Sequence, residues 1–119
     1  MSPAISLLLV NYNREDYLST AINSILSQTR ADFELLIWDD GSTDNSVTIA
    51  CEYEQQDDRI RVIAAQHQGV AKARKQAIAE TRGNYFGYID SDGLDCQYSF
   101  RKNSKSILFI LCFLYSLYF

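Results

Sequence analysis

Four short apolar runs, separated by segments of helical periodicity, constrain the fold of this chain more than any other feature. The apolar runs, each suited to a buried strand, are residues 4–10, 33–39, 60–65 and 85–90. The helical segments between them are residues 14–28, 42–54 and 69–82. Alternating strands and helices with short connections form a mostly parallel sheet, because right-handed crossovers place helices on its faces. The sequence therefore predicts an α/β fold with helices on both faces of the sheet.

Polar residues and glycines mark the ends of the predicted helices. Asn13, with Asp16 three residues later, is typical of a cap on the first helix. Residues 42–45 are rich in capping side chains and are expected to open the second helix. Gly83 is expected at the position just after the third helix, where glycine is favoured.

Composition narrows the classes of partner and the compartment. The chain has a net charge of −4 and a pI of about 4.8, which argues against nucleic acid as a partner. The three cysteines, Cys51, Cys96 and Cys112, lack a pairing pattern and indicate free thiols in a reducing compartment. Residues 4–10 lack a basic segment before them and are interpreted as a strand rather than a signal peptide. These features together predict a cytoplasmic protein.

The character of the chain changes after Asp95, which divides it into residues 1–95 and a polar, then apolar, tail at 96–119. Residues 107–119 are apolar almost throughout, but as a helix they would span only about 20 Å, short of a bilayer core. Three interpretations stay open for this tail. It is a truncated or frame-shifted end, a peripheral membrane contact, or an ordinary core element.

The first cluster of acids, Asp39 and Asp40, follows the second apolar run and precedes Gly41, which permits a sharp turn. Open α/β sheets bind ligands at the carboxyl ends of their strands. A carboxylate there could accept hydrogen bonds from a pyrimidine ring or from ribose hydroxyls. The alternative is that Asp40 only caps the next helix, because Asp-Gly-Ser is common turn chemistry.

The second cluster, Asp90-Ser91-Asp92, follows the fourth apolar run. Two carboxylates in this spacing supply the hard oxygen ligands that Mg²⁺ and Mn²⁺ prefer. Such an ion bridges the phosphates of a diphosphate and offsets their charge. The alternative is a solvated turn. Because both clusters end parallel strands, they are expected to share one cleft.

Further residues could assist such a site. Gly69 precedes a helix whose N-terminus favours anions, and Arg74 with Lys75 adds positive charge. Tyr12 follows the first strand and could stack on a base, although a buried tyrosine there is equally ordinary. The single histidine, His67, excludes a multi-histidine metal site and could contact a ligand. An ordinary charged surface helix is the alternative for residues 69–82.

Taken together, these segments resemble the nucleotide-sugar-binding half of family 2 glycosyltransferases, which have the GT-A fold. The blocks that carry the resemblance, in the family's order and spacing, are residues 8–13, 24–29, 33–44, 68–74 and 90–92. The resemblance implies a nucleotide-diphospho-sugar donor, most commonly a UDP-sugar. It also implies a glycan, lipid or protein acceptor and inversion at the anomeric centre.

The resemblance also implies residue roles. It gives nucleotide-binding positions to Val10, Tyr12, Asp39, Asp40, Gly69, Arg74 and Ser91, and metal-binding positions for Mn²⁺ or Mg²⁺ to Asp90 and Asp92. Asp40, with Asp39 beside it, would contact the base or ribose. Tyr12 would lie against the base, and Arg74 would lie near the donor.

The departures from the family pattern bear on activity. His67 and Lys75 stand where the family often has Asn, and Gly93 replaces a common third acid. Members of the family continue into a second half that carries the acceptor site and the catalytic base. We assign no base, because four acids of this chain do not match its position: Asp57, Asp58, Glu80 and Asp95.

Three functions are therefore compared. The first is a glycosyltransferase, and the second is a truncated remnant that binds nucleotide without transfer. The third, a phospho-accepting signalling domain, also gathers aspartates at strand ends. It requires a matched lysine on a later strand, which this sequence does not show.

Overall fold

The computed structural model describes residues 5–27, 33–83, 85–90 and 96–99. Its strands are β1 (Ile5–Asn11), β2 (Phe33–Asp40), β3 (Ile60–Ala65), β4 (Tyr85–Asp90) and β5 (Cys96–Ser99). Its helices are α1 (Glu15–Leu26), α2 (Ser46–Gln56) and α3 (Val70–Ala79). The elements therefore alternate as the apolar runs and helical segments predicted.

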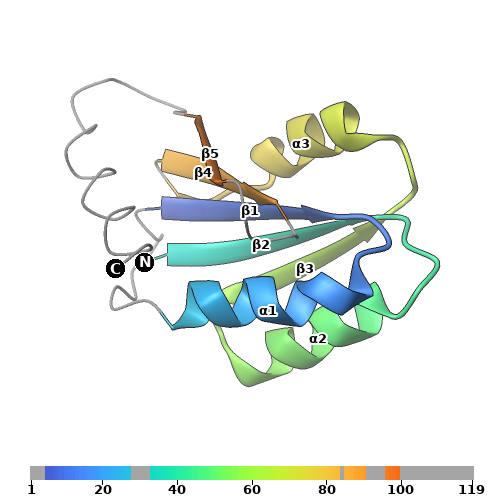
Figure 1. The fold of residues 1–119 in the computed structure, drawn as a ribbon. Helices are drawn as coiled ribbons and strands as arrows, with labels where there is room; N and C mark the ends of the chain where they lie inside the picture. The colour runs from blue at the N-terminus through green and yellow to red at the C-terminus, as the bar shows by residue number, and fades with distance from the viewer. Residues whose placement is uncertain (1–4, 28–32, 84, 91–95, 100–119) are drawn as a thin grey trace.

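The strands form one sheet in the order β3-β2-β1-β4-β5 (Figure 1). The pairs among β1 to β4 are parallel, whereas β5 runs antiparallel to β4. Val10 pairs with Trp38 of β2 on one side and with Asp90 of β4 on the other. The carboxyl ends of these three strands therefore meet at one edge of the sheet, which confirms the predicted fold class.

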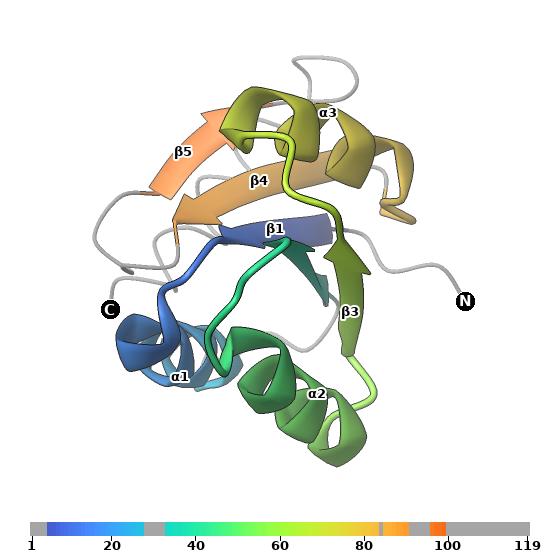
Figure 2. The same cartoon turned by 90° about the vertical axis from the view of Figure 1, so that its right-hand side faces the viewer.

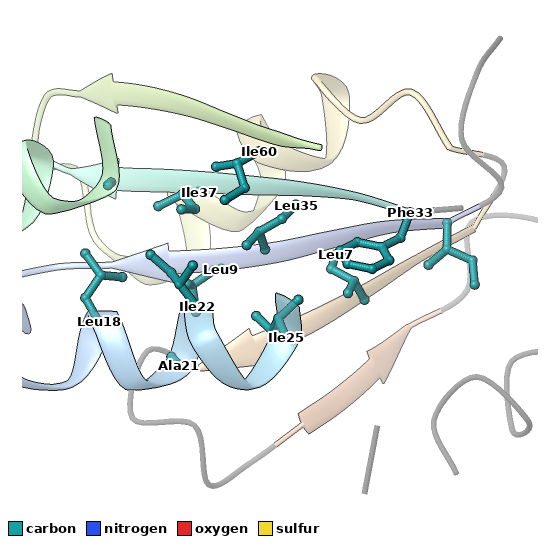
Figure 3. Packing of buried hydrophobic residues seen from close by; sticks show 12 residues of the cluster. Leu7, Leu9, Leu18, Ala21, Ile22, Ile25, Phe33, Leu35, Ile37 and Ile60 are labelled. Carbon is teal, nitrogen blue, oxygen red and sulfur yellow. The ribbon is translucent and has the colours of Figure 1, made fainter. Parts of the chain in front are cut away.

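Helices cover both faces of the sheet, with α1 and α2 on one side and α3 on the other (Figure 2). Odd-numbered residues of β1 and β2, such as Leu9 and Leu35, pack against Leu18 and Ile22 of α1 (Figure 3). Even-numbered residues pack against α3, where the two buried helix residues are alanines. The mostly apolar sequences of β1 and β2 follow from this arrangement, because these two strands are buried on both faces.

The start of α1 differs from the prediction, and the Asn13 cap was wrong. The N-cap position is Arg14, and Asn13 has a φ of 50°, in the left-handed region. The Asn13 side chain accepts the Thr43 N–H (2.8 Å) instead, and the Asp44 carboxylate accepts the Glu15 N–H (3.1 Å). The carboxylate that caps α1 therefore comes from Asp44, in the loop after β2.

The end of α3 also differs, because the helix finishes at Ala79 and Gly83 is not its C′ residue. A Cβ at Gly83 would lie 2.7 Å from Ser6 Oγ, so glycine is required by close packing. The Gly83 N–H donates to Ser6 Oγ (2.8 Å), and Ser6 Oγ donates to Glu34 Oε1 (2.6 Å). Glu34 Oε1 also accepts the Arg82 N–H (2.7 Å). This buried network holds the connection to β4 against β1 and β2.

Strand β5 was not predicted, because Cys96–Ser99 falls in the segment assigned to the tail. The sheet therefore continues past Asp95, while the division into residues 1–95 and 96–119 stays a prediction. Cys51 on α2 is a free thiol, as expected. Within the described ranges, none of the helices has the length and apolar character needed to cross a bilayer. Residues 107–119 lie outside the described residues.

Candidate functional site

Three loops and the ends of four strands meet at the carboxyl edge of the sheet, which faces the viewer in Figure 2. The loops are residues 12–14, 41–45 and 66–69. We call these loops, together with the last residues of β1, β2, β3 and β4, the rim. Most of the residues predicted to bind nucleotide lie on or next to this rim.

Asp39 and Asp40 are adjacent in sequence, but their side chains lie on opposite faces of the sheet. Asp39 is only 1% exposed and lies on the side of α1 and α2. Its carboxylate accepts hydrogen bonds from Asn11 Nδ2 (3.1 Å), Ser42 Oγ (2.6 Å) and the Ser42 N–H (2.8 Å). Asp39 therefore shapes the turn after β2. The alternative interpretation, in which Asp40 caps the next helix, is wrong, because the N-cap of α2 is Asn45 and Asp40 bonds to the loop after β3 instead.

Asp40 lies on the α3 side and is 2% exposed. Its Oδ1 accepts the Gln68 N–H (2.9 Å) and its Oδ2 accepts the Gly69 N–H (3.0 Å). The His67 Nδ1 atom lies 3.0 Å from Oδ2 and 3.1 Å from the Asp40 carbonyl oxygen. This one carboxylate therefore fixes the loop that leads into α3.

Gly41 brings the loops after β2 and β3 into direct contact. Its φ is +74°, and a Cβ built there would lie 2.5 Å from the backbone nitrogen of His67. Both the backbone angle and the close approach require glycine. Gly69, the N-cap of α3, also has a positive φ of +96°, but among the described residues no atom lies within 4 Å of a Cβ placed there. The N-terminus of α3 therefore borders open space.

Tyr12 and His67 form an edge-to-face pair with ring centroids 4.2 Å apart. The His67 side chain is 57% exposed. Because both atoms facing His67 Nδ1 are acceptors, the neutral imidazole carries its proton on Nδ1. Its Nε2 is then left as an acceptor. An aromatic surface thus lies beside the buried Asp40 carboxylate.

The loops after β1 and β2 are joined by a ladder of hydrogen bonds that sequence reasoning missed. Ser42 Oγ accepts the Asn13 N–H (2.9 Å), and Glu15 Oε2 accepts the Asn45 N–H (3.0 Å). Burial works to raise the pKa of the Asp44 carboxyl, but hydrogen bonds from Ser46 and the Glu15 N–H lower that pKa below its ordinary value. The sequence signal that could have predicted this ladder is the polar run that follows each of two consecutive parallel strands.

The structure describes only some of the remaining predicted residues. Val10 is half-buried beside Asp90, the last residue of β4, and Arg74 is half-buried on α3. Ser91 and Asp92 lie outside the described residues, as does Gly93. The described part of the chain contains no group of three or more His, Cys, Asp or Glu residues able to hold a metal ion. The structure thus brings Tyr12 and Asp40 together, with Asp90 on a nearby strand.

This mostly parallel sheet, with a polar and aromatic rim at the carboxyl ends of its parallel strands, defines an open α/β domain, a class that binds ligands at this edge. The sequence model described as "Glycosyl transferase family 2" matches residues 6–100. The chain belongs to this family.

Relatives and solved structures agree with that assignment. EpsH of Bacillus subtilis (strain 168) is 42% identical over 91 residues, covering 76% of this chain and 26% of EpsH. The structure of S. aureus TarS 1-349 in complex with UDP-GlcNAc is 28% identical, with a TM-score of 0.68. The match covers 74% of this chain and 26% of that one.

A mannosyltransferase from Pyrobaculum calidifontis, solved with GDP-Man and Mn²⁺, is 18% identical and has a TM-score of 0.70. The match covers 77% of this chain and 28% of that chain, and it shows the shared fold. The chain thus spans about a quarter of the length of these proteins. The fold is the GT-A fold of family 2 enzymes.

Proposed function

We propose that this chain forms the donor-binding part of a glycosyltransferase that takes its sugar from a nucleotide-diphospho-sugar. The observation that supports this most is the rim, where the buried Asp40 carboxylate lies beside the exposed ring of His67 and the ring of Tyr12. An aromatic ring next to a hydrogen-bond acceptor suits a nucleobase. Family membership supports the same function.

The proposed base is uracil, and the proposed donor is a UDP-sugar. A carboxylate oxygen has about two acceptor positions, and Asp40 Oδ1 accepts one N–H, from Gln68. The imide N–H of uracil or a ribose hydroxyl matches the remaining position. A family 2 relative of known structure, TarS, binds UDP-GlcNAc. The fold itself does not choose the base, since another protein with this fold binds GDP-Man.

Each nucleotide-binding residue then has a proposed task. Tyr12 lies against the base, and Val10 borders it at the end of β1. Gly69 leaves space at the N-terminus of α3, where backbone N–H groups favour an anionic group. Arg74, on the next turn of α3, lies near the donor. Asp39 acts through Ser42 by shaping the turn, and Ser91 is proposed as a contact at the end of β4.

Asp90 and Asp92 are proposed to hold Mn²⁺ or Mg²⁺. The position of Asp90 supports this, because Asp90 ends β4 in register with Val10, at the same edge of the sheet as Asp40. Its chemistry also fits, because these ions prefer carboxylate ligands. When bound, the ion would offset the charge of the diphosphate. The proposal includes either ion, Mn²⁺ or Mg²⁺.

Sugar transfer, to a glycan, lipid or protein acceptor, is proposed for the whole enzyme. No general base is assigned, and a positioned base contributes about 10²- to 10⁴-fold to rate. The alternative is a remnant that binds nucleotide without transferring a sugar. A cytoplasmic location belongs to the same proposal and is supported by the free thiol of Cys51.

Titration calorimetry of the 119-residue chain with UDP, with and without Mn²⁺, tests the proposal. We expect saturable binding of one UDP that Mn²⁺ strengthens, and much weaker binding of ADP and CDP. Asp40→Asn is expected to weaken UDP binding, whereas the exposed Asp16→Asn on α1 leaves it unchanged. Equal binding of all three nucleotides, or an Asp40→Asn variant that binds like the wild type, would contradict the proposal. A donor-hydrolysis assay on the same samples separates binding from turnover.

A further inference from the structure

Tyr12 is anchored on both sides by asparagines that reach across to the next loop. Before it, Asn11 Nδ2 donates to Asp39 Oδ1 (3.1 Å). After it, the Asn13 N–H donates to Ser42 Oγ (2.9 Å), and Asn13 Oδ1 accepts the Thr43 N–H (2.8 Å). The backbone on either side of the Tyr12 ring is thus tied to the turn after β2.

The Tyr12 ring itself contacts a residue of the loop after β3. Tyr12 contacts His67 at 4.2 Å between centroids, and His67 is bonded to Asp40. These contacts connect the loop after β1 to the loop after β3 and to the end of β2. Asn13 is exposed and has the left-handed φ of 50° that asparagine tolerates better than most residues. Neither property is needed for the apolar core.

We propose that Asn13 is a positioning residue that holds Tyr12 in place against His67 as a preformed surface for the nucleobase. This inference rests on the proposed function, in which the base lies against Tyr12. A ring fixed before binding does not lose its freedom when the ligand arrives, so fixing it strengthens binding without adding a ligand contact. Asn13 itself acts through Tyr12 and not on the nucleotide.

The first test needs no ligand, because His67 is the only histidine and its ring protons give unique NMR signals. Tyr12→Ala defines the signals of His67 without its ring partner. We expect Asn13→Ala to move the His67 signals toward those of Tyr12→Ala. Asn13→Asp keeps an acceptor and tolerates a positive φ, so it should retain the wild-type signals. Asn23→Ala, an exposed asparagine on α1, is the matched control.

Asn13→Gly separates the hydrogen bond from the backbone angle. Glycine accepts a positive φ readily but has no side-chain acceptor. If the Thr43 hydrogen bond positions Tyr12, Asn13→Gly should resemble Asn13→Ala. Unchanged His67 signals in both Asn13→Ala and Asn13→Gly would overturn the inference, whether or not the chain binds UDP. Far-UV circular dichroism confirms that each variant is folded.

The second test is a double-mutant cycle on UDP affinity. Tyr12→Ala is expected to weaken UDP binding about tenfold, within the range for base–aromatic stacking. Asn13→Ala should weaken UDP binding several-fold in the wild-type background and leave it unchanged in the Tyr12→Ala background. Losses that multiply in the double variant would overturn the inference. Failure of the wild type to bind UDP would refute the proposed function instead.

Discussion

Replacing Gly41 by alanine tests the contact between the loops after β2 and β3. The φ of +74° disfavours any residue with a Cβ, at a cost of about 1–2 kcal/mol. The added Cβ would also lie 2.5 Å from the His67 nitrogen and 3.0 Å from its Cα. These are backbone atoms that cannot rotate away, so overpacking adds about 1–3 kcal/mol. We expect a total loss of about 2–5 kcal/mol in the free energy of unfolding.

Urea unfolding followed by the fluorescence of Trp38, the only tryptophan, measures this loss. A loss of about 3 kcal/mol lowers the urea midpoint by about 1.5 M if the m-value is about 2 kcal/mol per M. Gly69→Ala is the matched control, because it has a positive φ but open space around its Cβ. We expect Gly69→Ala to destabilise the chain less than Gly41→Ala. Equal losses in the two variants, or an unchanged midpoint for Gly41→Ala, would refute the steric argument.

Three further predictions concern the rest of the fold. Glu34→Gln keeps an oxygen that accepts hydrogen bonds from the Ser6 hydroxyl and the Arg82 N–H, so it should lower the free energy of unfolding by under about 1 kcal/mol. Glu34→Leu removes that acceptor and leaves the buried Ser6 hydroxyl unpaired, so it should lower the free energy of chemical unfolding by about 2–4 kcal/mol. The bidentate hydrogen bond from Arg59 holds the pKa of Asp57 below its ordinary value of 3.8, so this stabilisation is present above pH 3.8 and is lost as the pH falls through the lower folded-state pKa. Asp57→Asn should therefore make stability less sensitive to acid in that range, and an unchanged pH profile would contradict this. Leu36→Ala, in the fully buried cluster under α3, should cost about 2–5 kcal/mol, and calorimetric melting that shows under 1 kcal/mol would contradict the packing.

Periodicity predicted the elements better than their ends. Residues 60–65 and 85–90 have the predicted strand bounds. The cap at Asn13 failed because the capping rule looks only a few residues along the chain. Asn13 bonds instead to Thr43, 30 residues away.

The sequence predicted that Asp40 and Tyr12 lie at one edge of the sheet, but it did not predict the geometry around them. Asp40 and Tyr12 lie at the same rim, as expected for the ends of parallel strands. Adjacent residues of a strand point to opposite faces, so Asp39 and Asp40 separate onto the two sides of the sheet. The role of Gly41 could not be read from sequence, because it depends on how closely the β3 loop approaches.

The central claim is that Asp40 and Asp92 serve one site that holds a nucleotide together with a divalent ion. The most direct measurement is paramagnetic broadening of the His67 ring signals by Mn²⁺, with Mg²⁺ as the diamagnetic control. Mn²⁺ alone should leave the signals sharp, whereas Mn²⁺ with UDP should broaden them, and Asp92→Asn should reduce that broadening. Signals that stay sharp at saturating UDP and Mn²⁺ would contradict the claim, as would broadening that Asp92→Asn leaves unchanged.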